Sequence, residues 1–313
     1  MVVKVAGSIN IDLVQSVSAL PRPGETVMAL GSARLPGGKG ANQAAASARI
    51  GARTLMIGAV GDDEGGRWMI DQLANCGVET CSVAQMAGLT TGAAYIAVDA
   101  GGENQIIVAP GANAALSAQH VGAASEGGDV LIAQLEVPIE TVRAFLPTSP
   151  NARCIRILNA APAVPGAQSL FDLADILIVN QHELAFYLGL PQAPHDVQGA
   201  LAARQLISRA EQVVVVTLGA LGAVAVRHDS HVHVPALPVV PLDTIGAGDC
   251  FVGTLAAALD SAGSARMSVE DALPLANAAA ALCTQKPGAI PAMPTLAEAE
   301  ALIASVNKSR GPS

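Results

Sequence analysis

The sequence predicts an α/β protein with three layers, in which a mostly parallel central sheet lies between two layers of helices and a small second sheet forms a lid. From about residue 129, short β-branched runs alternate with helix-like stretches. The runs are apolar throughout, as expected of parallel strands that are covered on both faces. Around residues 12–36 and 90–109, strand-like pieces instead follow one another through Gly-rich turns without a helix between them. These pieces predict the small sheet.

The elements of the central sheet follow in order along the chain. The segment 1–10, MVVKVAGSIN, contains a short apolar run that breaks at Gly7, and it is expected to be the first strand rather than a signal peptide. The next predicted strands are DVLIAQ, CIRILN, DILIVN and QVVVVTLG, at residues 129–134, 154–159, 175–180 and 212–219. The predicted helices between them are PIETVRAFL, HELAFYLG and ALAARQLISRA, at 138–146, 182–189 and 200–210. After residue 248 the chain is expected to be mostly helical. Since no repeat or long linker interrupts it, we interpret residues 1–313 as one domain with a lid formed by 12–36 and 90–109.

The composition restricts what the protein can bind and where it works. With 51% hydrophobic but only 2% aromatic residues, the core must consist of Ala, Val, Leu and Ile. A formal net charge of −9 argues against a nucleic-acid surface, which needs clustered Lys and Arg. Five cysteines without a CxxC pair suit reduced thiols, and no apolar stretch is long enough to span a bilayer. We therefore expect a cytoplasmic protein with no nucleic-acid or membrane partner.

The stretch DTIGAGDCF, residues 243–251, raises a question of charge. It precedes an apolar, Ala-rich run that predicts a helix, and the start of a helix offers free N–H groups to an anion. Gly246, Ala247 and Gly248 leave this backbone open to a ligand, yet Asp249 adds a carboxylate. Asp249 is either a helix N-cap or a base beside an anion that the amides hold. The second arrangement supplies what phosphoryl transfer to a hydroxyl requires, namely positioning, charge neutralisation and a base.

Other motifs are less specific. No GxxxxGK[ST] is present and no GxGxxG follows the first strand, which excludes a P-loop nucleotide site. GGKGAN, residues 37–42, is by itself as consistent with a Gly-rich turn carrying a solvated Lys39 as with a binding loop. The histidines of RHDSHVH could suggest a metal, but their place between short strand runs favours an exposed hairpin.

Taken together and in this order, GGKGAN and DTIGAGDCF resemble the two signatures of the PfkB family of carbohydrate kinases. The resemblance extends from GSINID to PGAIPAMP, and within the family it is to the ribokinases, through PGETV, QLEVP and LNAAPA. It implies the ribokinase-like form of the fold, ATP and D-ribose as ligands, and D-ribose 5-phosphate as product. It also implies Mg²⁺ with ATP, K⁺ as a second cofactor and a homodimer.

The resemblance also implies roles for individual residues. Asp249 matches the catalytic base, and Gly246, Ala247 and Gly248 match the anion hole. The positions that match the sugar site are Asn10, Asp12, Gly38, Lys39, Asn42 and Glu136, with Ala94, Ile96 and Val108 of the lid facing the sugar. The positions that match the nucleotide site are Asn180, Glu183, Thr217, Gly219, Gly222 and Asn277. Asn180 and Glu183 would help to place Mg²⁺ and the phosphates, although Glu183 alone would be interpreted as a first-turn helix carboxylate.

The implied K⁺ site departs from the family pattern. The matching positions are Asp243, Ile245, Cys283, Lys286 and Gly288, which would act largely through backbone carbonyls. The last position, which carries a hydroxyl in the family, is Ala292 here, so the affinity for K⁺ is expected to be weaker than with a serine there. Cys250 adjoins the base and could be reactive.

Two other functions stay open from the sequence. One is a PfkB kinase that acts on deoxyribose, a nucleoside or a different sugar. The other is a catalytically silent sugar-binding regulator, against which an intact Asp249 with its glycines argues, since a binding protein needs no base.

Overall fold

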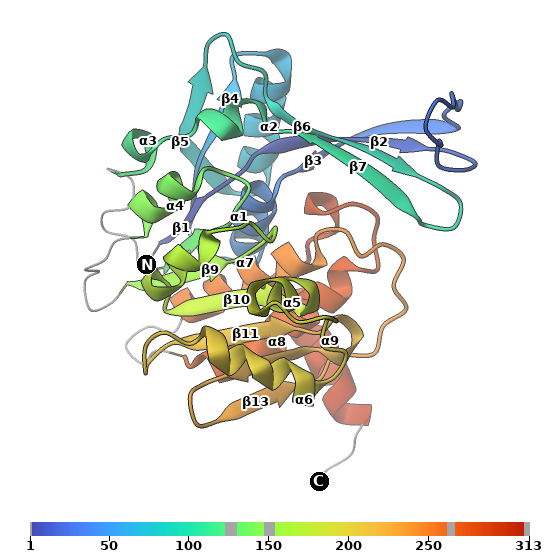
Figure 1. Ribbon diagram of the computed structural model, residues 1–313. Helices are drawn as coiled ribbons and strands as arrows, with labels where there is room; N and C mark the ends of the chain where they lie inside the picture. The colour runs from blue at the N-terminus through green and yellow to red at the C-terminus, as the bar shows by residue number, and fades with distance from the viewer. Residues whose placement is uncertain (1, 123–129, 147–153, 262–266, 310–313) are drawn as a thin grey trace.

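The central sheet of the computed structural model, which describes residues 2–122, 130–146, 154–261 and 267–309, is mostly parallel as predicted (Figure 1). Its strands in spatial order are β13 (His231–Val234), β12 (Ala223–Val226), β11 (Val213–Thr217), β10 (Ile176–Asn180), β9 (Ile155–Asn159), β8 (Val130–Ala133), β1 (Val3–Ala6), β4 (Thr54–Gly61) and β5 (Val78–Met86). From β11 to β5 all neighbours are parallel, and β12 and β13 form an antiparallel hairpin at one edge.

The strand–helix alternation begins well before the predicted residue 129. β1, α1 (Lys39–Arg49), β4, α2 (Glu64–Asn75) and β5 already build one end of the sheet. The sequence pattern missed this end because β5 is an edge strand. Most of its residues are only partly buried, and polar residues interrupt its apolar ones, so it forms no unbroken apolar run.

Two of the three predicted internal helices are present, and a 3₁₀ helix takes most of the place of the third. α4 (Ile139–Phe145) and α5 (Gln181–Leu188) lie where expected, but 200–210 holds the end of α6 (Val197–Ala200) and a 3₁₀ helix, Leu201–Leu206. The buried residues here are Ala200, Ala203 and Leu206, which are spaced by three. A 3₁₀ helix has three residues per turn and therefore points all three at the sheet, whereas an α-helix would rotate them apart.

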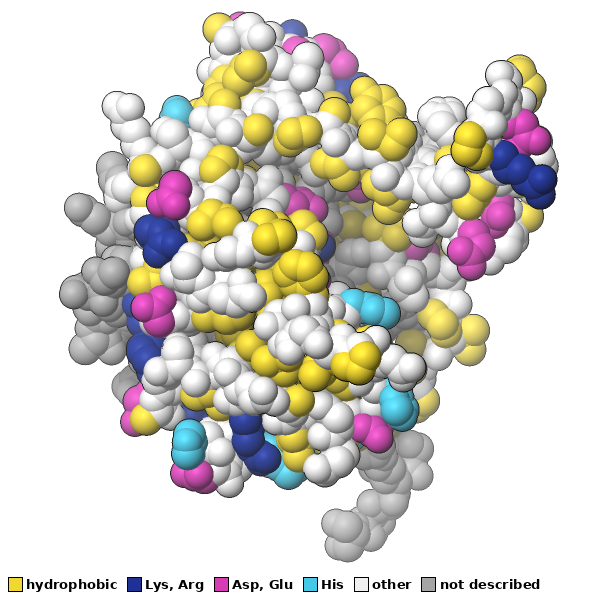
Figure 2. All heavy atoms as spheres, viewed as in Figure 1, with side chains coloured by type: hydrophobic (Ala, Val, Ile, Leu, Met, Phe, Trp, Pro, Cys, Tyr) yellow, Lys and Arg dark blue, Asp and Glu magenta, His cyan; other side chains and the backbone are white. Residues whose placement is uncertain are grey.

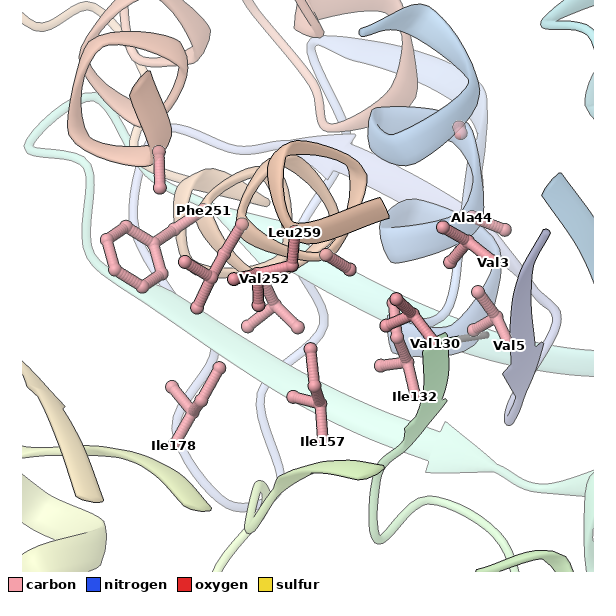
Figure 3. Close-up of a cluster of buried hydrophobic side chains, with 14 of the residues drawn as sticks. Val3, Val5, Ala44, Val130, Ile132, Ile157, Ile178, Phe251, Val252 and Leu259 are labelled. Carbon is pink, nitrogen blue, oxygen red and sulfur yellow. The ribbon is translucent and has the colours of Figure 1, made fainter. Parts of the chain in front are cut away.

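The helices cover both faces of the sheet. On one face, α1, α2, α7 (Ala247–Ser261) and α8 (Val269–Cys283) pack on alternate strand residues such as Val5, Ile132 and Ile157 (Figure 3). On the other face, α3 (Ala118–Gly122), α4, α5 and the 3₁₀ segments pack on the intervening residues, among them Leu131 and Leu158. α9 (Leu296–Ser309) packs outside α8, so the predicted helical C-terminal region is confirmed. The inner strands β8, β10 and β11 are buried on both faces, which is why their sequences contain unbroken apolar runs.

Four strands form the second sheet, which reaches away from the central sheet (Figure 1). Their order is β3 (Gly31–Gly37), β2 (Asn10–Ser16), β6 (Gly92–Val98) and β7 (Asn104–Ala109). Leu35, Asp12, Ala94 and Val108 are opposite one another and thus form one row on one face. Arg34 of β3 forms an ion pair with Glu64 of α2 at 3.0 Å, which ties this sheet to the main body.

The histidine-rich motif forms the expected hairpin. His228 lies in the turn between β12 and β13, where the Arg227 N–H donates to the Ser230 carbonyl, and His231 and His233 lie exposed in β13. Within the described ranges, no three His, Cys, Asp or Glu side chains are grouped so that they could hold a metal. None of the helices in these ranges is long and apolar enough to cross a membrane.

A glycine sets the distance between α1 and α7. A Cβ atom on Gly253 would lie 2.3 Å from the Gln43 carbonyl oxygen and 2.7 Å from Ala46 Cβ, closer than packed atoms approach. Only glycine therefore lets the two helices touch at this point. Gly253 lies four residues after Asp249, so the contact faces the same side of α7 as that carboxylate.

Candidate active site

The candidate site lies at the carboxyl ends of the parallel strands, where ligands bind in open α/β sheets. Asn159, Asn180 and Thr217 are the last residues of β9, β10 and β11, and all three line one cavity of about 230 Å³. A second pocket of about 680 Å³ adjoins it and shares Asn180, Thr217 and Gly248. Polar residues at the ends of three neighbouring strands therefore converge at one edge of the sheet.

Asp249 is held by α1 and does not cap its own helix. It is the third residue of α7 and is buried, with 7% of its surface exposed. Its Oδ2 accepts a hydrogen bond from Asn42 Nδ2 at 3.0 Å, and its Oδ1 accepts one from Gln43 Nε2 at 2.9 Å. The N-cap interpretation is thus wrong, because both described hydrogen bonds of the carboxylate come from another helix.

The glycine loop before Asp249 lies open to the cavity. Gly246 and Gly248 line it together with Asp249, and Gly246 has a φ of 76°, which favours glycine. A Cβ on Gly246 would also lie 2.5 Å from Ala289 Cβ, so this loop contacts the segment around Gly288 directly. Ala247, the other predicted anion-hole residue, lines the adjoining larger pocket, and its N–H donates to the Thr244 carbonyl at 3.3 Å. The glycine loop consequently borders a space that an anion could fill.

Lys39 lies in the same cavity as Asp249. It is the first residue of α1 and lines the same cavity as Asp249 and Glu183. The negative charge of Asp249 raises the pKa of Lys39, with further contributions from Glu136 and Glu183, while burial opposes the rise. The ammonium group therefore stays charged and is available to a transferred phosphoryl group as well as to a sugar.

The predicted sugar residues come from both sheets. Glu136 Oε2 accepts hydrogen bonds from Ser8 Oγ and, at 3.1 Å, from the Lys39 N–H. Asn10 is buried, and its Oδ1 accepts a hydrogen bond from Asn113 Nδ2 at 2.7 Å, so its own NH₂ group is the part left for a ligand. The backbone of Gly38 precedes α1 with a φ of 91°. Asn42 uses its nitrogen for Asp249, and its Oδ1 is buried and has no hydrogen-bond partner among the described residues.

The carboxyl group of Asp12 is strongly perturbed by its surroundings. Its pKa rises to about 7, first because burial disfavours the charged form and then because Glu136 and Asp249 are negative. Ala94 and Val108 lie in its row, and Ile96 lies two residues further along β6 on the same face. The three lid residues expected near the sugar thus share the face of Asp12.

Asn180 and Glu183 form a capping box at the start of α5. Asn180 Oδ1 accepts from the Glu183 N–H at 2.9 Å, and Glu183 Oε2 accepts from the Asn180 N–H at 2.8 Å. Glu183 is therefore a first-turn carboxylate of α5, as its sequence position alone suggested. Both residues nevertheless line the cavity, and burial raises the pKa of Glu183. One carboxylate oxygen, Oε1, is not used by the box.

Most of the predicted nucleotide residues line the larger pocket. They are Asn180, Thr217, Gly219, Gly222 and Asn277 of α8, whereas Glu183 lines only the smaller cavity. Asn277 Nδ2 donates to the Val234 carbonyl at 2.9 Å, so its oxygen is the group left for a ligand. The pocket wall between them is mostly apolar, with residues such as Phe251. This combination suits an aromatic base with a polar end.

The loops that match a K⁺ site are joined by one side chain. Asp243 Oδ1 accepts from the Ile245 N–H at 2.9 Å, and its Oδ2 accepts from the Gly288 N–H at 2.8 Å. Cys283 is buried and the Lys286 ammonium points to Glu298 at 3.5 Å. The carboxylate of Asp243 is thus occupied by amides, and carbonyl oxygens are what these loops could offer a cation. Ala292 is buried and adds no oxygen from its side chain.

Cys250 does not have the surroundings of a reactive thiol. It is fully buried, and its pKa is raised by its hydrogen bond with Cys283 and by burial. A raised thiol pKa lowers the fraction of thiolate, which is the reactive form. We expect Cys250 to be inert in the folded protein.

Several polar residues behind this site were not predicted from the sequence. They are Ser8, Gln43, Asn113, Gln134 and Asn159, all buried. Gln43 donates to Asn159 Oδ1 as well as to Asp249, and Gln134 donates to Gln43. The sequence does contain a signal for these residues, because each is an amide or hydroxyl inside an otherwise apolar or Ala-rich run. Such a group needs a hydrogen-bond partner when it is buried, which points to a polar cluster.

Comparisons with known proteins agree with this geometry. The pfkB family carbohydrate kinase model matches residues 2–296. The ribokinase of Bacillus subtilis (strain 168) is 36% identical over 305 residues, which cover 96% of this chain and 98% of that protein. The bifunctional ribokinase/ribose-5-phosphate isomerase A of Fructilactobacillus sanfranciscensis is 34% identical over 311 residues, covering 98% of this chain and 56% of that protein. The chain therefore spans little more than half of this bifunctional relative.

A solved structure matches over nearly the whole fold. The structure of Arabidopsis thaliana ribokinase complexed with ribose and ATP superposes with a TM-score of 0.82 at 30% identity, covering 96% of this chain and 98% of that chain.

The raised pKa of Asp12 predicts a pH-dependent stability. The pKa of the Asp12 carboxyl group is about 7 in the folded state, against an ordinary value of 3.8. The folded state therefore holds this proton more tightly than the unfolded state does. The resulting contribution to stability is fully present below about pH 4 and is lost as the pH rises through about 7. Asp12→Asn removes the ionisation, so we expect its free energy of unfolding to rise relative to the wild type between about pH 4 and pH 8, by on the order of 2–4 kcal/mol.

Urea unfolding at each pH measures this difference. Asp71→Asn, at an exposed position of α2, serves as the control and should follow the wild type at all pH values. A difference between Asp12→Asn and wild type that stays constant from about pH 4 to pH 8 would contradict the prediction.

Proposed function

Because this chain belongs to the PfkB family of carbohydrate kinases, we propose that it transfers the γ-phosphoryl group of ATP to D-ribose, giving D-ribose 5-phosphate and ADP. The observation that carries the proposal is the position of Asp249. Its carboxylate lies where a cavity lined by amides and Lys39 borders the nucleotide-sized pocket. The relatives named ribokinase, and the similar structure complexed with ribose and ATP, support D-ribose as acceptor.

In the proposed reaction Asp249 accepts the proton of the sugar hydroxyl while the hydroxyl oxygen attacks the γ-phosphorus. The bond from that phosphorus to the bridging oxygen breaks, and ADP leaves. The amides of Gly246, Ala247 and Gly248, together with the Lys39 ammonium, neutralise the charge on the transferred group. Asn10 would donate to a sugar hydroxyl, because its oxygen is used by Asn113, and Asp12 would accept from another hydroxyl. Asn42 would accept through its Oδ1, which is buried and has no partner among the described residues.

The donor set fits Mg²⁺ bound together with ATP. Mg²⁺ prefers oxygen ligands and usually keeps phosphate and water oxygens around it, so one protein carboxylate suffices. Glu183 Oε1 is such an oxygen, and Asn180 lies beside it on the same cavity wall. When bound, the ion would neutralise phosphate charge, and Glu183 would hold it on the nucleotide side of the cavity.

The test of the function is phosphoryl transfer from MgATP to a panel of acceptors. D-Ribose should be the best substrate, ahead of 2-deoxyribose, adenosine and D-fructose, with the sugar phosphate measured by chromatography. Asp249→Asn keeps the shape of the side chain but removes the base, and should lower kcat by about two to four powers of ten while ATP binding persists.

Two outcomes would contradict this assignment. A nearly normal kcat for Asp249→Asn would remove the residue from the mechanism. A strong preference for deoxyribose, for a nucleoside or for another sugar would instead support the alternative PfkB kinase. The absence of transfer to any acceptor would support the catalytically silent sugar-binding protein.

We also propose that K⁺ binds between the loops 243–245 and 283–288. Asp243 clamps these loops together, and the contact of Gly246 with Ala289 joins them to the anion hole. A cation there would order the amides that face the phosphoryl group without touching the substrate. Preorganised donors act mainly in the transition state, so the effect should appear in kcat.

A titration with KCl against choline chloride at equal ionic strength tests this site. KCl should activate the wild type, and Ala292→Ser should lower the K⁺ concentration for half-maximal activation by supplying a hydroxyl ligand. Ala292→Cys is the matched control, because its sulfur has a similar size but is a poor ligand for a hard cation. Direct detection of the sugar phosphate avoids coupling enzymes that themselves need K⁺. The same rate in both salts for all three proteins would contradict the K⁺ site.

We further propose that two copies of the chain pair through the small sheet. β7 is an edge strand with all six residues exposed, and Tyr95 and Ile107, opposite each other on one face, are 51% and 71% exposed. Figure 2 shows apolar side chains on this projecting sheet. Apolar surface beside an unpaired edge is unusual on a monomer.

Sedimentation velocity at micromolar concentration should therefore give a dimer. Ile107→Lys should shift it toward the monomer, whereas Asn104→Lys, at the end of the same strand, should have a smaller effect. A wild type that sediments as a monomer would overturn the proposed pairing.

A further inference from the structure

A chain of buried amides ends on the base. Gln134 Nε2 donates to Gln43 Oε1 at 2.6 Å, and Gln43 Nε2 donates to Asp249 Oδ1 at 2.9 Å and to Asn159 Oδ1 at 3.0 Å. Gln43 and Gln134 have no exposed surface, and Asn159 is 7% exposed. We call Gln134, Gln43 and Asn159 the amide relay. Its three members come from the end of β8, from α1 and from β9, so it joins three elements behind α7.

The carboxylate determines the direction of every amide in the relay. An ionised carboxylate only accepts hydrogen bonds, so Gln43 must turn its NH₂ group toward Asp249. The two hydrogens of that group are then used by Asp249 and Asn159, and Gln43 Oε1 has to accept from Gln134. Reversing Gln43 alone, or Gln134 alone, would bring two acceptor oxygens face to face.

This direction leaves one atom unsatisfied. Gln134 Oε1 is buried and finds no hydrogen-bond partner among the described residues. A buried polar atom without a partner destabilises the folded state, and an apolar side chain of the same size would avoid that. The unpaired oxygen is therefore a cost that accompanies the orientation of Gln134 toward Gln43.

We propose that Gln43 is the positioning residue of the base and that Gln134 holds its amide in the direction the base needs. Asn42 and Gln43 each donate to one oxygen of Asp249 from the α1 side. The remaining lone pairs then point toward the cavity, where the attacking hydroxyl must deliver its proton. The proposal rests on the proposed phosphoryl transfer, because it concerns the same carboxylate.

Two substitutions of Gln134 separate its effect on the orientation of the Gln43 amide from its effect on side-chain packing. Gln134→Met keeps the approximate volume but cannot donate at any pH. Gln134→Glu has almost the shape of glutamine and can donate to Gln43 Oε1 only when it is protonated. Once ionised it only accepts, so the Gln43 amide must turn its NH₂ group toward residue 134 and its oxygen toward Asp249.

The two variants should therefore differ in pH dependence. We expect kcat of Gln134→Glu to equal that of the wild type at about pH 5.5 and to fall about ten- to hundredfold below it by about pH 8.5. Gln134→Met should be lowered by a similar factor across the whole range. Because neither change touches a ligand, KM for ATP and for the sugar should stay within about twofold of the wild type.

Other groups near the base also titrate, so kcat of each variant is divided by kcat of the wild type at the same pH. The titratable side chains that surround the base come from several elements. They are Lys39 of α1, Asp12 of β2, Glu136 after β8, Glu183 of α5, Cys250 of α7 and Cys283 of α8, with Asp249 itself on α7. They are present in all three proteins, so the ratio of kcat to the wild-type value at each pH isolates residue 134. Thermal unfolding of each variant shows whether the folded state is kept.

The outcomes are distinguishable. A wild type that phosphorylates no acceptor refutes the proposed function. An active wild type with equal, pH-independent ratios for Gln134→Glu and Gln134→Met, or with changes in KM instead of kcat, refutes the relay. Loss of the folded state in both variants would show that Gln134 serves stability, and it would also overturn the proposal.

Discussion

The site depends on the contact between α1 and α7, which brings an amide pair against a carboxylate. Asn42 and Gln43 are neighbours on α1, and both donate to Asp249, which lies 207 and 206 residues away in the sequence. The contact requires Gly253, because any Cβ there would strike the α1 backbone. One close approach therefore aims the base, and the glycine loop, the sugar residues and the nucleotide pocket are arranged around it.

Charge is the second constraint, and it explains why a phosphate bound at this site would need a cation with it. Asp12, Glu136, Glu183 and Asp249 are all close enough to influence one another or Lys39. A buried group of carboxylates with one ammonium is costly in the absence of ligands, as the raised pKa values of Asp12 and Glu183 show. Bound hydroxyl groups and a cation-neutralised phosphate would relieve that cost.

Most of the fold could be predicted because its signals are local. The unbroken runs VLIA, ILIV and VVVV predicted buried parallel strands, and these are β8, β10 and β11. The pattern failed where tertiary contacts override it. β5 is polar because it lies at an edge, and 200–210 adopts a 3₁₀ helix because Ala200, Ala203 and Leu206 must face the sheet together. The expected cytoplasmic location and division into domains rest on the sequence alone and stay predictions.

By itself, the sequence determined the family, the strand–helix order and the two loops that meet at the site, since motifs and periodicities are properties of neighbouring residues. Tertiary structure alone decided how the side chains there are used. It showed that Asp249 is not a helix cap, that Glu183 also closes a capping box, and that Gln43 and Gln134 stand behind the base. The physical reason is that a hydrogen-bond partner is chosen by distance in space. The partners of Asp249 lie on another helix, and no local pattern records which atoms a folded chain will bring within 3 Å.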